Sequence, residues 1–169
     1  DVVPGQRSAS HIVYFHGGAY CFEITSYHWK LIADLAERTG ARVTVPIYPL
    51  APEHDFHDMF RMAMATYRSV LGQTRASDVV FMGDSAGGNM AVVLTMMAAE
   101  KRLPLPGRHV LISPGLDMAA TEAMTEAACQ AGLPEREART TIQSAYRAAT
   151  RLGPTNSARP TNTIEGVRL

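Results

Sequence analysis

The chain has 169 residues, 46% of them hydrophobic, and its sixteen Lys and Arg balance sixteen Asp and Glu. This length suits one globular domain with its own core, and the charge balance gives no electrostatic basis for binding nucleic acid or an anionic membrane surface. No apolar run approaches the ~20 residues that a transmembrane helix needs, so we expect no membrane span. Two cysteines, Cys21 and Cys129, are too few for a disulfide framework. This favours small apolar roles for both and a reducing, cytoplasmic location.

The first part of the chain alternates between strand-like and helix-like patterns. Residues 10–16 are rich in β-forming residues and predict a buried strand that ends at a glycine pair. Residues 26–39 carry apolar residues four apart and precede Gly40, a typical residue after a helix end. Residues 41–47 predict the next strand, in which Pro46 falls near the end, where a missing N–H is tolerated.

The alternation continues through the middle of the chain. Residues 56–71 have the spacing of an amphipathic helix, and Asp55 precedes them as a capping residue. An apolar strand over 79–82 leads into an almost continuously apolar helix over 86–99. A further strand is expected over 109–113.

Strands that alternate with helices indicate βαβ units, and therefore a parallel sheet with helices on both faces. The fold class predicted from the residues is α/β. Ligands of open α/β sheets bind at the carboxyl ends of the strands. Two unusual turns fall at that edge, one after the first strand and one after the third.

The turn after the third strand has the sequence G-D-S-A-G, from Gly83 to Gly87. A strand, a G-x-S-x-G turn and a helix together form the context of a nucleophile elbow. Ser85 would stand at a helix N-terminus, where free N–H groups favour negative charge. We interpret Ser85 as an acyl-accepting nucleophile; the alternative is a tight turn with an N-capping serine.

The turn after the first strand has the sequence H-G-G-A-Y at residues 16–20. Two glycines after a strand leave backbone N–H groups uncovered and able to face a cleft, as in the oxyanion loop of lipases and esterases. A glycine pair in this position is also compatible with a simple turn. The position of both motifs at the carboxyl ends of strands favours the functional reading.

Taken together, these motifs resemble the hormone-sensitive-lipase-like group of α/β-hydrolases. The matching blocks are V-Y-F-H-G-G-A-Y at 13–20, Y-P-L-A-P-E-H at 48–54 and G-D-S-A-G-G-N at 83–89, with a weaker L-I-S-P-G-L-D at 111–117. The resemblance covers roughly residues 1–118. It implies an α/β-hydrolase fold and a carboxylesterase that cleaves short- or medium-chain acyl esters without a cofactor or metal.

The resemblance also implies roles for individual residues. Ser85 would be the nucleophile that forms the acyl-enzyme. The oxyanion would be bound by the backbone N–H groups of Gly17, Gly18 and Ala86. His16 and Asp84 would support the motifs, and His16 would not be the catalytic base. Residue 19 is Ala where many members of the group carry a third glycine.

The acid and the base of a catalytic triad are missing from the expected region. In this fold the triad residues follow the order Ser, Asp or Glu, His along the chain. The histidines of the chain are His11, His16, His28, His54, His57 and His109. None follows the last predicted strand, and Asp117 matches a structural aspartate of the group and not the triad acid.

We therefore expect a hydrolase fold that lacks its C-terminal strands and is incomplete at both ends. Residues 1–118 would form a partial hydrolase core and 119–169 a divergent tail of helix and coil, with a helix over 138–151. A fragment, a truncation or a reading-frame change near 119–130 would produce this pattern.

Two alternatives to the esterase remain open. One is a catalytically inactive α/β domain that binds a small apolar ligand or a partner chain. The other is a metal site in the H-D-F-H-D segment at 54–58, although acidic residues in a first helical turn have a simpler explanation in the helix dipole. The sequence gives no indication of the oligomeric state.

Overall fold

The computed structural model describes residues 1–3 and 8–116 in full. Between 122 and 140 it also describes residues 122, 125, 126, 128–130, 132, 134–136, 139 and 140. Most of the expected tail over 119–169 lies outside the described residues, as do Asp117 and the end of the helix expected over 138–151.

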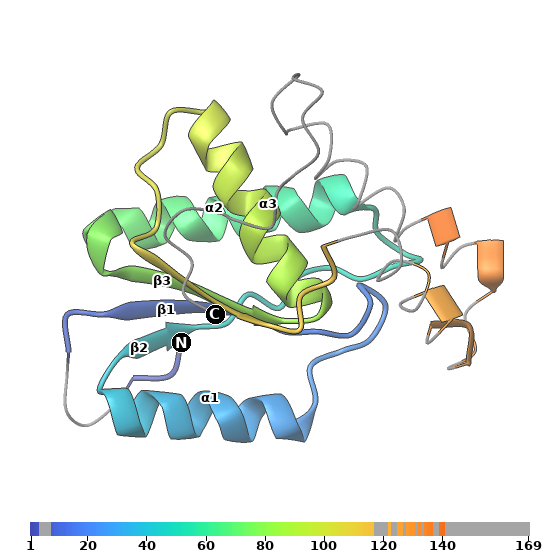
Figure 1. Cartoon of the computed structure of the whole chain (residues 1–169), viewed down its shortest axis with the longest axis horizontal. Coiled ribbons are helices and arrows are strands. Elements are labelled where there is room, and N and C mark those ends of the chain that lie inside the picture. The colour runs from blue at the N-terminus through green and yellow to red at the C-terminus, as the bar shows by residue number, and fades with distance from the viewer. Residues whose placement is uncertain are drawn as a thin grey trace.

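Four parallel strands form one sheet in the order β2-β1-β3-β4 (Figure 1). The strands are β1 (His11–Phe15), β2 (Arg42–Thr44), β3 (Val79–Asp84) and β4 (Arg108–Ile112). From β1 the chain forms β2 on one side of β1, and it then crosses to form β3 on the other side. The strand order therefore reverses between β1 and β3, which is where open α/β sheets form their ligand crevice.

The register of the two central strands brings both motif turns together. In β1 and β3 the pairing runs from His11 with Val79 to Phe15 with Gly83. Both strands consequently end at the same level of the sheet. The H-G-G turn and the serine turn emerge side by side at the carboxyl edge.

Helices cover both faces of this sheet, as the sequence predicts (Figure 1). They are α1 (Ser26–Thr39), α2 (Phe56–Leu71) and α3 (Ala86–Glu100). Helix α1 covers one face, and α2 and α3 cover the other. None of the helices in the described part of the chain has the length and hydropathy of a membrane-spanning segment.

The packing follows the two-residue period of β1. Ile12 and Tyr14 point into the core shared with α1, whereas Val13 and Phe15 point into the larger core under α2 and α3. All four side chains are buried. Because both faces of β1 are covered, the strand is apolar at every one of these positions.

The helix bounds predicted from the sequence are confirmed for α1 and α2. Gly40 ends α1 with a φ of 66°, a left-handed conformation that glycine adopts at low cost. The Asp55 carboxylate accepts hydrogen bonds from the N–H groups of His57 and Asp58 and so caps α2.

The strand predicted over 41–47 is wrong in length, since β2 ends at Thr44. It pairs with three residues of β1, from His11 to Val13, and the chain then leaves the sheet before Pro46. A proline has no N–H to donate to a strand ladder, which agrees with the early end of β2. A short 3₁₀-helix, Ala76–Asp78, was not predicted.

Strand β4 lies at an edge of the sheet and is covered on one face. His109 and Leu111 are half-buried toward α3, whereas Val110 and Ile112 are 43% and 40% exposed. Among the described residues, no strand pairs with the outer edge of β4. In the described residues, this edge of the sheet is therefore unpaired, and two apolar side chains beside it are exposed.

Candidate active site

Ser85 occupies the junction between β3 and α3 in a strained backbone conformation. Its φ is 49° and its ψ is −116°, values that non-glycine residues rarely adopt. The Ser85 N–H donates to the Ile112 carbonyl at 2.9 Å, and its own carbonyl accepts from Asn89 and Gly115. These contacts hold the strained turn in place and leave the side chain half-buried at the carboxyl edge of the sheet.

Two glycines allow the backbone of this turn to press against the end of β1. A Cβ atom on Gly87 would lie 2.0 Å from the Phe15 carbonyl oxygen, and one on Gly83 would lie 2.5 Å from the Gly87 carbonyl. No side chain fits in either space. The glycines of G-D-S-A-G thus serve the close backbone approach that a nucleophile elbow requires.

The H-G-G turn forms a loop with several residues in left-handed conformations. Gly18, Ala19 and Tyr20 have φ values of 126°, 51° and 62°. The Gly18 carbonyl accepts from the N–H groups of Cys21 and Phe22, which closes the loop. The N–H groups of Gly18 and Ala19 donate to no other described residue.

A third backbone N–H without a described acceptor belongs to Ala86, the first residue of α3. The first N–H groups of a helix have no partner within the helix. The Ser85 side chain does not cap α3. The Ser85 hydroxyl is therefore free of this local role, and the capping alternative is not the arrangement observed.

Gly17 differs from the sequence-based expectation. Its N–H donates to Asp84 Oδ1 at 3.0 Å, so this donor is occupied and does not face an oxyanion. A Cβ on Gly17 would lie 2.2 Å from Asp84 Oδ2. Gly17 is needed because the carboxylate packs directly against its Cα, and its expected role as a donor is corrected accordingly.

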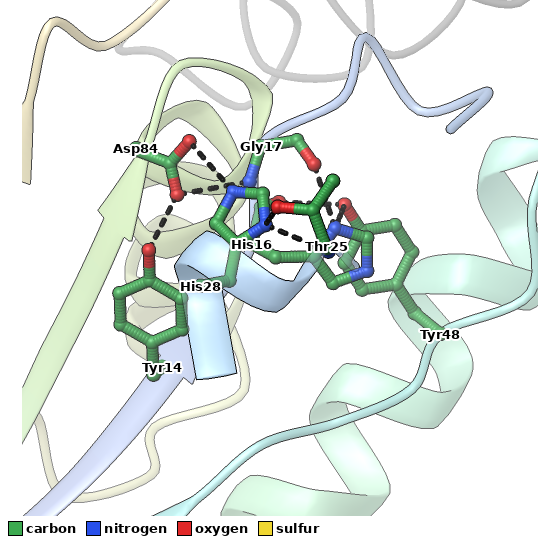
Figure 2. A network of polar contacts seen from close by, with 7 residues as sticks. All are labelled: Tyr14, His16, Gly17, Thr25, His28, Tyr48 and Asp84. Atoms are coloured by element: carbon green, nitrogen blue, oxygen red, sulfur yellow. Dashed lines mark hydrogen bonds and ion pairs between the residues drawn. The ribbon is translucent and has the colours of Figure 1, made fainter. Parts of the chain in front are cut away.

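The Asp84 carboxylate is the centre of a polar network (Figure 2). Its Oδ1 accepts from the Tyr14 hydroxyl at 2.6 Å as well as from Gly17, and its Oδ2 lies 3.4 Å from His28 Nε2. Burial, and then the hydrogen bond to Asp84, raise the pKa of Tyr14, which keeps its hydroxyl protonated as a donor. The network joins β1, β3 and α1 next to Ser85.

His16 is buried, and its hydrogen-bond partners are Gly17 and Tyr48, not Ser85. Its ring stacks on Tyr48 with centroids 4.4 Å apart, and its Nδ1 lies 2.6 Å from the Gly17 carbonyl. Because a carbonyl only accepts, Nδ1 carries the proton in this hydrogen bond. Burial lowers the pKa of His16, which favours the neutral ring. This geometry fits a supporting residue of the loop.

Asn89 is a contributor that the motif analysis did not single out. Its side chain accepts from the Tyr20 hydroxyl at 2.7 Å and donates to the Gly115 carbonyl at 2.8 Å. Both Tyr20 and Asn89 are buried. This amide joins the loop over residues 16–20, the first turn of α3 and the segment after β4. The signal that could have found it is the final N of the G-D-S-A-G-G-N block.

No described side chain forms a hydrogen bond with the Ser85 hydroxyl. The structure gives the Ser85 hydroxyl no hydrogen bond to any described histidine or carboxylate, while His16 and His28 are engaged elsewhere. The segment over 54–58 also has other partners: Asp55 caps α2, and Asp58 contacts His54 and Arg61. In the part of the chain that the structure describes, no three metal-binding side chains gather at one point.

Two hollows lie away from the serine. One of about 350 Å³, near the amino ends of β1 and β2, is lined in part by His11, Arg42 and Thr74. Another of about 590 Å³ lies at the start of α2, beside Asp55 and Asp58. Cys21 and Cys129 are both half-buried free thiols packed against the larger core. These features stand outside the Ser85 site.

Known proteins share this architecture and part of this sequence. A family model described as alpha/beta hydrolase fold matches residues 12–166. A triacylglycerol lipase of Mycobacterium tuberculosis is 36% identical over 119 residues, and an esterase of Acinetobacter venetianus is 33% identical over 123 residues. These matches cover 70% and 72% of this chain, but 27% and 41% of the relatives.

Solved structures agree with the sequence relatives. The crystal structure of a hormone-sensitive lipase from a metagenome library has a TM-score of 0.66 and 29% identity, and the match covers 86% of this chain and 50% of that one. The chain belongs to the alpha/beta hydrolase fold family. Within it, the resemblance to the hormone-sensitive-lipase-like carboxylesterases is confirmed. The chain spans less than half the length of the first two relatives named above.

Proposed function

We propose that the Ser85 site hydrolyses carboxylic esters through an acyl-enzyme. The observation that carries this proposal is the strained conformation of Ser85, with its φ of 49°, beside backbone N–H groups that have no described acceptor. Strain of this kind persists only where the surrounding structure enforces it, and it is concentrated at functional sites. Relatives named as an esterase and a triacylglycerol lipase support esters as the substrate class.

In the first step, the Ser85 hydroxyl oxygen attacks the ester carbonyl carbon and loses its proton. The carbonyl π electrons move onto oxygen, and the N–H groups of Gly18, Ala19 and Ala86 stabilise that oxyanion. The intermediate then collapses, and the alcohol leaves with a proton. Water attacks the acyl-enzyme in the same way and releases the carboxylic acid and free Ser85.

The base of this reaction is not assigned to any residue of the chain. All six histidines precede residue 110, and no described one contacts Ser85. In the part of the chain that the structure describes, no group is hydrogen-bonded to the Ser85 hydroxyl, so in this proposal hydroxide from solvent takes the serine proton. An oxyanion hole and substrate binding without a complete triad retain about 10³–10⁴-fold acceleration over water. We therefore propose weak esterase activity for the chain as it stands.

The second candidate is a domain of this fold that binds a small apolar ligand or a partner chain without catalysis. The missing base favours it, and so does the open edge of β4 with Val110 and Ile112 exposed. The two candidates differ in one respect that can be measured. Only the first requires a reactive Ser85 hydroxyl.

The test is hydrolysis of p-nitrophenyl esters by the full chain, beside Ser85→Ala and the control Ser69→Ala, which alters an exposed serine of α2. We expect hydrolysis of the acetate and butyrate above that of the octanoate, lost in Ser85→Ala and retained in Ser69→Ala. The rate should rise with pH without a plateau near neutrality, because no histidine base titrates there. Equal rates for wild type and Ser85→Ala would favour the binding domain.

A further inference from the structure

The Asp84 carboxylate is held from three directions. Tyr14 in β1 and the Gly17 amide share Oδ1, while His28 in the first turn of α1 faces Oδ2 at 3.4 Å (Figure 2). The side chains of His28 and Asp84 are 19% and 26% exposed. Solvent thus reaches the pair only in part, and an interaction between them is less screened than one at the open surface.

The other ring nitrogen of His28 fixes which way the ring faces. The Thr25 N–H donates to His28 Nδ1 at 3.0 Å, so Nδ1 holds a lone pair and not a proton. The proton of the ring is consequently on Nε2, the atom that faces Asp84. The capping box that starts α1 therefore aims a donor at the carboxylate beside the nucleophile.

Removing the His28 donor would leave Oδ2 without a described partner. The Asp84 carboxylate would then be free to rotate, and the hydrogen bonds from Tyr14 and Gly17 would be shared between its two oxygens. Because Gly17 immediately precedes Gly18, a shift at its amide moves the loop that carries the unpaired N–H groups. Displacements of about 1 Å at a reaction site cost up to about 10²-fold in rate.

We propose that His28 is a positioning residue: it holds the Asp84 carboxylate, and through Asp84 and Gly17 it fixes the oxyanion loop beside Ser85. The proposal rests on the proposed function of that site. It assigns to the start of α1, nearly sixty residues before Ser85 in the sequence, a role in ester hydrolysis. His28 does not touch the substrate or the reacting atoms.

The first test compares steady-state kinetics of His28→Leu, His28→Gln and the control Tyr27→Leu, which alters a neighbouring side chain that is 84% exposed. We expect His28→Leu to lower kcat by about 10- to 100-fold with KM nearly unchanged, because the loop acts on the transition state. His28→Gln presents an amide N–H to Asp84 and should recover most of the loss. Tyr27→Leu should behave like wild type.

The second test does not depend on turnover. Amide hydrogen exchange of Gly17, followed by NMR in the full chain, should become about 10-fold faster in His28→Leu, while core amides such as that of Phe81 are unaffected. Ser85→Ala should leave Gly17 exchange unchanged. Unchanged Gly17 exchange in His28→Leu would overturn the positioning role, whether or not the chain hydrolyses esters.

If His28→Leu does not fold, His28→Asn takes its place, since its shorter amide does not reach Asp84 but keeps a polar residue in the first turn of α1. Loss of activity in Ser85→Ala with normal Gly17 exchange in His28→Asn would refute the positioning role and leave the proposed function intact. Fast Gly17 exchange in His28→Asn would support the positioning role. If wild type and Ser85→Ala then hydrolysed esters at equal rates, only the proposed function would be refuted.

Discussion

The Tyr20 hydroxyl and the Asn89 amide form a buried contact that joins the loop over residues 16–20 to helix α3. Tyr20 adopts a φ of 62°, and its hydroxyl donates to Asn89 Oδ1 at 2.7 Å. Burial raises the pKa of Tyr20, so the hydroxyl keeps its proton and its role as donor. The contact holds a strained residue whose backbone would otherwise relax.

Tyr20→Phe should therefore destabilise the protein. The change leaves Asn89 Oδ1 buried without its donor, which costs about 1–3 kcal/mol in the free energy of unfolding. Urea denaturation measures this, with Tyr27→Phe as a control that removes the same hydroxyl from an exposed side chain. Identical midpoints for the two variants would show that the buried hydrogen bond contributes nothing.

Sequence reasoning proposes candidate site residues that belong to local patterns, and it missed the residues that reach the site only through the tertiary fold. Ser85, Gly18 and Ala86 stand in motifs whose spacing within a turn indicates their chemistry. His28 and Tyr14 reach Asp84 from 56 and 70 residues away in the sequence. In the folded chain the Gly17 N–H donates to Asp84, whereas the motif alone indicates a free donor.

At the level of secondary-structure elements, the shape of the serine turn is fixed because β3 and α3 pack against the end of β1. Gly87 is the point of closest approach, where an added Cβ would meet the Phe15 backbone. Neither partner is a flexible side chain that could move aside. The position of Ser85 relative to the loop over residues 16–20 is thus set by contact between backbones.

Gly87→Ala is expected to reduce the free energy of unfolding by about 3 kcal/mol or to prevent folding, because the methyl group overlaps backbone atoms of β1. Gly72→Ala is the matched control: Gly72 has an ordinary φ of −70°, and an added Cβ there would lie 3.3 Å from its nearest neighbour. Thermal and urea unfolding of both variants measure the difference. A Gly87→Ala protein as stable as Gly72→Ala would contradict the packing described for the elbow.

Helix bounds were predictable because their signals are local. The apolar spacing and Gly40 determine α1, and Asp55 caps α2, so each helix carries its own boundaries in the sequence. Strand lengths depend on partners. Strand β2 ends at Thr44 because its pairing with β1 ends there, and no pattern within 41–47 predicts that end.

Over the whole molecule, three histidines that are buried or half-buried have a lowered pKa, which favours the neutral ring. Burial is the main cause that lowers the pKa of His11, His16 and His109. His11 bonds Thr74 and Thr44 through its two ring nitrogens, and His109 bonds Thr95. The folded state therefore binds fewer protons than the unfolded chain at mildly acidic pH.

The free energy of unfolding should fall as the pH drops below about 6.5, where the unfolded histidines take up protons. Each such histidine adds at most about 1.4 kcal/mol per pH unit to the slope of the free energy of unfolding against pH. Urea denaturation between pH 7.5 and 5.5 measures it. His11→Gln should reduce the slope, because it removes one of these buried titrating rings. Stability independent of pH over this interval would contradict neutral burial of the three rings.

The central claim is that Ser85 is a nucleophile, and covalent capture tests it most directly. The full chain is incubated with diethyl p-nitrophenyl phosphate, in which attack by a serine oxygen on phosphorus expels p-nitrophenolate, and peptide mapping by mass spectrometry locates the diethylphosphoryl group. We predict a single adduct on Ser85, absent from Ser85→Ala and retained in Ser69→Ala. An unmodified Ser85, or equal labelling of Ser85→Ala, would contradict the assignment and leave a hydrolase fold without a reactive serine.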